Sequence, residues 1–157
     1  MNEAAPNERV RAAARAAGLE IDVRTMPGST HTAPEAAAAL ACDLGQIVKS
    51  LIFKGRESGK PHLLLVSGKN RVNENGVAGF IGESLGRADP AFVKDVTGYE
   101  VGGIPPLGLQ SAMPAWFDRD LLNWEMVWAA AGTGDTLFGV APRALLSATG
   151  ATILQVS

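Results

Sequence analysis

Residues 47–54 read Ile47-Val48-Lys49-Ser50-Leu51-Ile52-Phe53-Lys54, which is the strongest β-strand signal in the chain. A second apolar run, Leu63–Ser67, follows across the turn Gly55–Pro61. Two such runs separated by a short segment that contains glycine are typical of a β-hairpin. We therefore expect the two segments to pair in one sheet.

Helices and further strands alternate along the rest of the chain without a strict βαβ rhythm, which favours an α+β domain around one mixed sheet. Asn7, Thr32 with Glu35, and Asp89 are expected caps of helices. The expected helices are 7–17, 32–40, 73–85, 90–96 and 142–148, and the expected further strands are 20–26, 115–117, 126–131, 137–140 and 152–156.

The composition, with 46% hydrophobic and 19% charged residues, is that of an ordinary globular protein. No apolar run approaches the roughly 18 residues that cross a bilayer, so we expect no membrane contact. Met1–Val10 lacks the basic start and apolar stretch of a secretion signal. The single cysteine, Cys42, is expected to be a structural thiol in a reducing compartment, the cytoplasm.

Charge is distributed unevenly along the chain. The net charge of −2 argues against bulk electrostatic binding of nucleic acid, and we expect no DNA partner. From Lys49 to Lys94, however, there are eight basic and four acidic residues, so this segment carries +4 and the remainder −6. A solvated surface of mixed charge is the simpler interpretation, and a local patch that contacts phosphate stays open.

The common catalytic templates are absent from the sequence. His31 and His62 lie far apart and in no metal-ligand pattern, so we predict neither a metal site nor a cofactor. There is no Gly-x-Ser-x-Gly elbow, no phosphate-cradling glycine loop and no dinucleotide fingerprint.

Lys49 is the first of two features that remain. Strand alternation places it on the face of Ile47, Leu51 and Phe53. A charge on an apolar face needs a partner or a cleft. A lysine of an edge strand can instead reach water and protect the edge from aggregation. The pattern alone leaves both interpretations open, and Ser50 alternates to the opposite face.

The second feature is the loop Gly102-Gly103-Ile104-Pro105-Pro106-Leu107-Gly108, within a stretch, Thr97–Leu109, that is too rich in glycine and proline to be regular. Glycine lets the backbone approach a ligand closely, and proline keeps a loop rigid. Such a loop can direct main-chain groups at a substrate. A purely structural turn is the alternative.

Together these segments resemble the YbaK/ProX family, which includes the editing domain inserted in bacterial prolyl-tRNA synthetases. The block Thr-Gly-Tyr-x-x-Gly-Gly-x-Pro-Pro-x-Gly is the most specific part. The resemblance covers about residues 30–145 and rests on Gln46–Phe53, Leu64–Gly68, Val96–Gly108, Asp118 and Ala129–Thr133. It implies one editing domain over residues 1–157, with a central mixed, partly barrel-like sheet flanked by helices.

The resemblance also implies a metal-free hydrolase that acts in trans on misacylated tRNA, namely tRNA for proline that carries a small non-cognate amino acid. Lys49 would contact the aminoacylated 3′ end, where it would either neutralise the terminal phosphate or stabilise the negative charge that develops at the ester carbonyl. The substrate's own ribose hydroxyl would assist hydrolysis. A prolyl-tRNA synthetase or an elongation factor would be the protein partner. The expected pocket residues are Gly102, Gly103, Ile104, Pro105, Pro106, Thr30, His31, Ser50, Gly132 and Thr133.

Two departures from the family leave the amino acid open among alanine, serine, threonine, cysteine and 2-aminobutyrate. Alanine-specific editors resemble Lys-Asn-Leu-Phe-Leu where this chain has Lys49–Phe53, and YbaK itself carries Gly-Gly-Lys-Arg-Gly where this chain has Ala131–Gly134. The alternatives are a non-catalytic module that binds tRNA ends or a synthetase, and a hydrolase of another small ester. Asp118 is expected to cap a helix at 119–122, and a role in the site stays open as the alternative.

Overall fold

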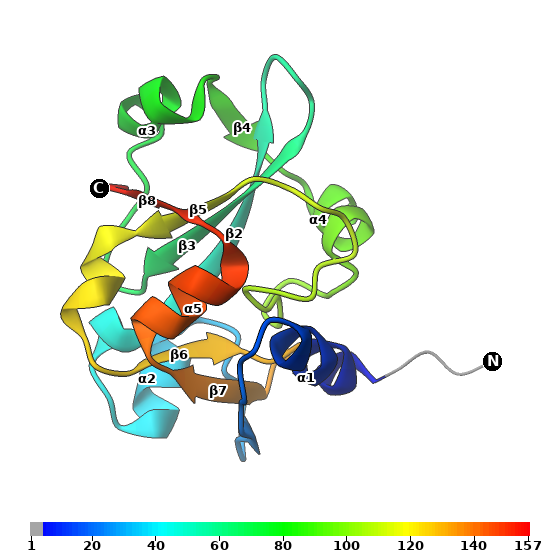
Figure 1. The fold of residues 1–157 in the computed structure, drawn as a ribbon, viewed down its shortest axis with the longest axis vertical. Helices are drawn as coiled ribbons and strands as arrows, with labels where there is room; N and C mark the ends of the chain where they lie inside the picture. The colour runs from blue at the N-terminus through cyan, green and yellow to red at the C-terminus, as the bar shows by residue number, and fades with distance from the viewer. Residues whose placement is uncertain (1–4) are drawn as a thin grey trace.

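The computed structural model describes residues 5–157 and contains two β-sheets surrounded by helices (Figure 1). One sheet is five-stranded and mixed, with the order β4-β2-β3-β5-β8, and the other is three-stranded and antiparallel, with the order β1-β7-β6. The helices are α1 (Pro6–Ala16), α2 (Ala33–Leu40), α3 (Glu74–Ile81), α4 (Pro90–Thr97) and α5 (Pro142–Thr149), with 3₁₀ helices η1 (Leu44–Gln46) and η2 (Arg119–Asn123). The strands are β1 (Val23–Thr25), β2 (Val48–Gly55), β3 (Pro61–Ser67), β4 (Leu85–Arg87), β5 (Ala115–Asp118), β6 (Val127–Ala130), β7 (Thr136–Val140) and β8 (Thr152–Leu154).

The predicted hairpin of β2 and β3 forms the centre of the larger sheet, with Lys49 opposite Val66. The other edge of β2 is covered only at its ends. An isolated bridge joins Ile47 to Trp128 of β6, and β4 pairs with Phe53–Gly55. Among residues 5–157, no strand pairs with 49–52 on this side, so β2 has an open edge in its middle.

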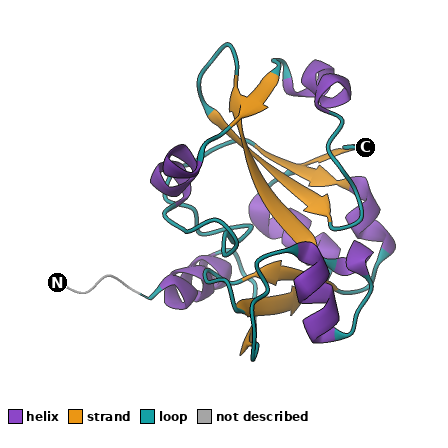
Figure 2. Cartoon of the chain, turned by 180° about the vertical axis from the view of Figure 1, so that it is seen from behind, coloured by secondary structure: helices purple, strands orange, loops and turns teal. Residues whose placement is uncertain are grey.

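The main hydrophobic core lies between the two sheets and is closed by α1 and α5. β2 contributes to it through Val48 and Ile52, while Leu51 and Phe53 pack on the opposite face with α3 and the C-terminal residues. Apolar packing on both faces fixes the register of β2, because a slip by one residue would exchange the two faces. Figure 2 views the chain from behind and shows the larger sheet above the smaller one.

The α+β class is confirmed, but the strands form two sheets joined by the Ile47–Trp128 bridge rather than the single mixed sheet we expected. The capping box of Thr32 and Glu35 and the Asp89 cap are also confirmed. Within the described residues, no helix is both long and apolar enough to cross a membrane.

Several local predictions were wrong. Asn7 does not cap α1, whose N-cap is Ala5; its side chain instead donates to the carbonyl of Ala131 and to Thr136. The helix predicted at 73–85 ends at Ile81, because Gly82 takes a left-handed conformation and a short strand, β4, follows. The strands expected at 20–26 and 152–156 are limited to β1 and β8, where pairing partners are available.

Candidate active site

A cavity of about 570 Å³ lies at the open edge of β2. Its walls come from segments that are distant in sequence: β2, the turn after β3, the start of α2, the loop around Gly102, and the two sheets where they meet. The lining residues relevant to chemistry are Thr30, His31, Lys49, Ser50, Gly68, Lys69, Asn70, Arg71, Gly102 and Ile104.

The edge position explains how Lys49 and Ser50, which alternate to opposite faces of β2, line the same cavity. Ile47 accepts a hydrogen bond from Gly68 on the β3 side, and Gly55 donates to Lys60 on that side. Alternation therefore directs the main-chain N–H and C=O of Ser50 to the open edge. The Ser50 hydroxyl is also buried, with no hydrogen-bond partner among the described residues.

Lys49 is half-buried, and its ammonium donates a hydrogen bond to the main-chain carbonyl of Asn70. Among residues 5–157, no carboxylate oxygen lies within 4.0 Å of it. Burial lowers the pKa of Lys49, the charge of Asp118 opposes that shift, and the nearby Arg71 adds to it. Lys49 thus lines a cleft, and its charge is only partly compensated. A cleft is what we expected if the lysine is a functional cation on an apolar strand face.

Asp118 is 1% exposed and contacts the turn Gly68–Arg71, which follows β3, through the side chain of Asn70. It caps η2 by accepting from the N–H of Asp120, so the predicted capping role is present, on a 3₁₀ helix. Its other oxygen accepts from the N–H of Ser67 at 3.0 Å and from the side chain of Asn70 at 2.8 Å. Asn70 also donates to Asp120 at 2.8 Å. Asp118 therefore holds the residue that contacts Lys49.

The glycine-proline loop is irregular, as expected, and is fixed by specific contacts. The Tyr99 hydroxyl donates to the carbonyl of Gly108 at 2.9 Å, which closes the loop. Gly102 has φ +96°, and a Cβ there would meet the His31 ring at 3.0 Å. A Cβ on Gly103 would lie 2.8 Å from the main chain of Thr133. Glycine is therefore required at both positions for this close packing.

The predicted pocket residues are divided by the structure. Thr30, His31, Lys49, Ser50, Gly102 and Ile104 line the cavity at β2, whereas Gly103, Pro105 and Pro106 are buried and do not line it. Gly132 and Thr133 line a second cavity of about 690 Å³, which shares His31 and Val101 with the first.

The sequence did not single out the turn Gly68–Arg71. Lys69 and Arg71 stand out there only as members of the basic segment, and Asn70 has no distinguishing feature. These residues line the cavity together with Lys49, which lies about twenty positions earlier in the chain. No local periodicity in the sequence signals that two such distant segments lie side by side. The nearest signal was the excess positive charge from Lys49 to Lys94.

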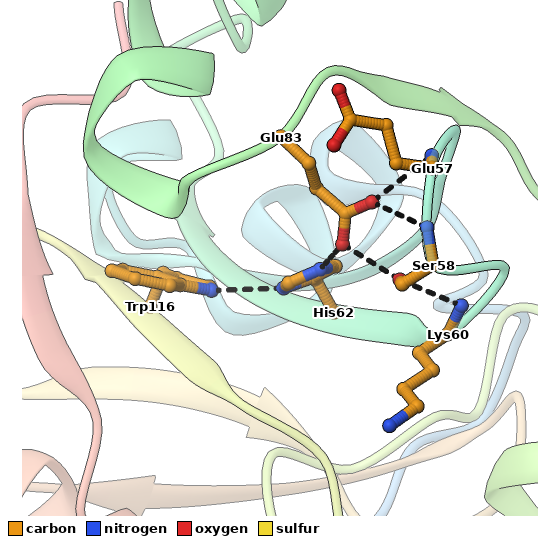
Figure 3. A network of polar contacts seen from close by, with 6 residues as sticks. All are labelled: Glu57, Ser58, Lys60, His62, Glu83 and Trp116. Carbon is orange, nitrogen blue, oxygen red and sulfur yellow. Dashed lines mark hydrogen bonds and ion pairs between the residues drawn. The ribbon is translucent and has the colours of Figure 1, made fainter.

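A separate polar cluster occupies the opposite end of the β2–β3 hairpin (Figure 3). His62 and Glu83 are in contact through Nε2 and Oε2 at 2.9 Å, and Trp116 donates to the other ring nitrogen of His62. Glu83 also accepts from the N–H groups of Glu57 and Ser58 and from the Ser58 hydroxyl. The main-chain bond from Ser58 and the contact with His62 lower the Glu83 pKa to about 2. The cluster ties the hairpin turn to the segment before β4 and lines neither cavity.

Comparison with known proteins gives a family for this fold and site. The model of the aminoacyl-tRNA editing domain matches residues 28–148. Among curated proteins, the chain is 28% identical to the uncharacterized protein YwhH of Bacillus subtilis (strain 168), over 80% of each chain. It is 32% identical to a proline–tRNA ligase of Limosilactobacillus fermentum, where the match covers 74% of this chain but only 20% of the ligase.

Solved structures agree with the sequence comparisons. The crystal structure of a candidate trans-editing enzyme for prolyl tRNA synthetase is 41% identical, with a TM-score of 0.91 and 99% of both chains covered. The crystal structure of the hypothetical protein APE2540 is 33% identical, with a TM-score of 0.87 over 94% of this chain and 98% of that one. The resemblance noted in the sequence is confirmed, as is the predicted class of enzyme, an aminoacyl-tRNA deacylase. The chain belongs to the aminoacyl-tRNA editing domain family.

Proposed function

We propose that the protein is a trans-editing hydrolase that removes a small non-cognate amino acid from tRNA for proline. The observation that carries the proposal is the cavity at the open edge of β2, which is lined both by Lys49 and by the glycine-proline loop through Gly102 and Ile104. The cavity volume of about 570 Å³ lies within the usual range for small-ligand sites, roughly 300–1,000 Å³, and suits an aminoacylated nucleoside.

The proposed chemistry needs no protein nucleophile and no metal. A water molecule adds to the ester carbonyl carbon, the bond to the ribose oxygen breaks, and that oxygen takes a proton to leave free amino acid and uncharged tRNA. The neighbouring ribose hydroxyl of the substrate assists the proton movement. The Lys49 ammonium stabilises the negative charge that develops on the carbonyl oxygen. An activated ester is an undemanding substrate, so positioning and charge stabilisation suffice.

The substrate would be held by groups that converge on the cavity. Ser50 presents its main-chain groups at the open edge of β2, and Gly102 and Ile104 line the same cavity. Selection by size discriminates weakly, about 1–3 kcal/mol for each methylene. The side chain removed therefore stays open among alanine, serine, threonine, cysteine and 2-aminobutyrate. Gly132 and Thr133 would contact the substrate from the second cavity, next to His31, which lines both cavities.

We further propose that residues 1–157 form one editing domain, of which Met1–Ala4 lie outside the described residues. The protein would work in the cytoplasm, where its tRNA substrate is produced, and would meet that tRNA beside a prolyl-tRNA synthetase or an elongation factor. Its affinity for tRNA alone would be modest, because the net charge is −2.

A deacylation panel tests the function. Transfer RNA for proline is charged separately with the five candidate amino acids and with proline, and release of the amino acid is measured with and without enzyme. Faster hydrolysis of at least one non-cognate ester, with prolyl-tRNA spared, supports editing. Binding of tRNA without turnover of any ester would instead support a non-catalytic binding module.

A further inference from the structure

The cavity at β2 has an unusual charge balance. Its lining includes three cations, Lys49, Lys69 and Arg71, and no aspartate or glutamate among the described residues. One ammonium accounts for stabilisation of an ester carbonyl. The other two are left without a role in the proposed chemistry, and they flank Asn70 on the same turn.

The turn that carries these two cations is held rigidly. Gly68 donates to the carbonyl of Ile47 at 2.7 Å, and Asn70 donates to that of Ser67 at 2.9 Å. The Asn70 side chain reaches both Asp118 and Asp120. Because these bonds fix the backbone on both sides of Lys69 and before Arg71, little chain ordering remains to be done when a ligand binds.

Both cations are available to an anion. Lys69 and Arg71 are exposed, and neither has a carboxylate oxygen within 4.0 Å among residues 5–157. The nearby carboxylates of Asp118 and Asp120 accept hydrogen bonds from Asn70 instead. The Lys69 ammonium lies 5.9 Å from the Trp124 ring centroid, a cation–π contact that supplies no negatively charged partner. Arg71 also disfavours the charged form of Lys49, and a bound anion would relieve that repulsion.

We propose that Lys69 and Arg71 form a phosphate-binding site for the phosphodiester that joins the aminoacylated nucleoside to the rest of the RNA. This inference rests on the proposed function, and it gives the three cations two separate roles, at the phosphate and at the ester. Arginine forms paired hydrogen bonds with phosphate oxygens, and lysine adds a mobile point charge. Lys49, deeper at the strand edge, is then left for the ester carbonyl.

The test compares two substrates that carry the same ester. One is an alanylated minihelix RNA with the tRNA acceptor end, and the other is alanyl-adenosine, which has no phosphate. The variants are the double change Lys69→Ala/Arg71→Ala and the charge-keeping change Lys69→Arg/Arg71→Lys. The matched control, Lys60→Ala/Arg87→Ala, removes two exposed cations of the same basic segment that do not line the cavity.

We expect Lys69→Ala/Arg71→Ala to lose about tenfold or more in kcat/KM on the minihelix, since hydrogen bonds to charged groups contribute strongly. Hydrolysis of alanyl-adenosine should not change on the plateau of the pH profile, below the alkaline limb that Arg71 shifts. The salt dependence of kcat/KM on the minihelix should become shallower by roughly 0.7 in log–log slope for each phosphate that the variant no longer neutralises. The charge-keeping variant should retain most activity, and the control should resemble wild type on both substrates.

Equal losses of activity on both substrates in Lys69→Ala/Arg71→Ala would overturn the proposal, because the two cations would then act at the ester. An unchanged rate of this variant on the minihelix would overturn it as well. If the wild type hydrolyses neither these alanine esters nor the matching esters of serine, threonine, cysteine and 2-aminobutyrate, the proposed function fails separately. The phosphate site is then decided by fluorescence anisotropy with uncharged minihelix: binding weakened by Lys69→Ala/Arg71→Ala but not by the control supports it, and equal binding contradicts it.

Discussion

The ammonium of Lys49 donates its hydrogen bond to the main-chain carbonyl of Asn70, 21 residues further along the chain. This one contact joins the open edge of β2 to the turn that follows β3. Asn70 is in turn held by the buried Asp118. The position of the proposed catalytic cation therefore depends on a polar network that lies outside its own strand.

Asn70→Ala should reduce kcat for deacylation by roughly tenfold, in the range for loss of hydrogen bonds to charged groups. The substitution removes both side-chain bonds, to Asp118 and Asp120, and frees the turn that holds Lys49. Single-turnover rates measure the effect. Asn75→Ala, at an exposed position of α3, is the control and should leave the rate unchanged.

The pH dependence of the rate should respond to Asp118 and Arg71 in opposite directions. The Asp118 charge raises the pKa of Lys49, and Arg71 lowers it. If the charged lysine is the active form, activity is lost as pH rises through its pKa. Asp118→Asn should therefore move the alkaline limb to lower pH, and Arg71→Ala should move it to higher pH. Limbs that stay in place in both variants would exclude Lys49 as the titrating group.

The wall formed by His31 depends on Gly134, where a Cβ would lie 2.0 Å from the ring nitrogen Nε2. Gly134→Ala should displace the exposed His31 ring from the cavity wall, and the altered wall should position the substrate less well and reduce kcat/KM by roughly tenfold. In a His31→Ala background the same substitution should have little further effect. Gly79→Ala, with open space at its Cβ, is the control. A full effect of Gly134→Ala without the ring would show that another contact is responsible.

The Glu83 cluster should make stability depend on acid. The pKa of the Glu83 carboxyl is lowered from 4.5 to about 2 in the folded protein. The ionised carboxylate therefore stabilises the folded state above about pH 4.5, and this stabilisation is lost as the pH falls towards 2. Glu83→Gln should lower the melting temperature at pH 7 and flatten its decline across that interval. Glu57→Gln should do neither, since Glu57 contributes only its main-chain N–H to Glu83. Equal acid sensitivity of Glu83→Gln and wild type would contradict this assignment.

The sequence predicted those parts of the fold that depend on local pattern. The hairpin of β2 and β3 followed from two apolar runs and a glycine turn, and the Thr32 and Asp89 caps from their side chains. The three residues of β4 are too few to show a period, and Asn7 looked like a cap because its bonds to Ala131 and Thr136 are made across the fold. The division into two sheets depends on partner choice between distant strands, which no local pattern encodes.

The candidate site shows the same limit. Lys49 and the loop at Gly102 were predicted from alternation, glycine content and resemblance, and the structure places both at one cavity. The turn with Lys69, Asn70 and Arg71 could not be predicted, because nothing in its sequence indicates that it faces β2. Gly132 and Thr133 adjoin the next cavity instead, with His31 as the shared wall.

The most direct test of the central claim is the single-turnover rate of deacylation of misacylated tRNA for proline by Lys49→Met, which keeps the length of the side chain and removes its charge. Loss of a preorganised group that stabilises developing charge costs about 10²–10³ in rate. We predict a loss of this size, with tRNA affinity and melting temperature close to wild type and partial activity in Lys49→Arg. Deacylation by Lys49→Met at the wild-type rate would contradict the account.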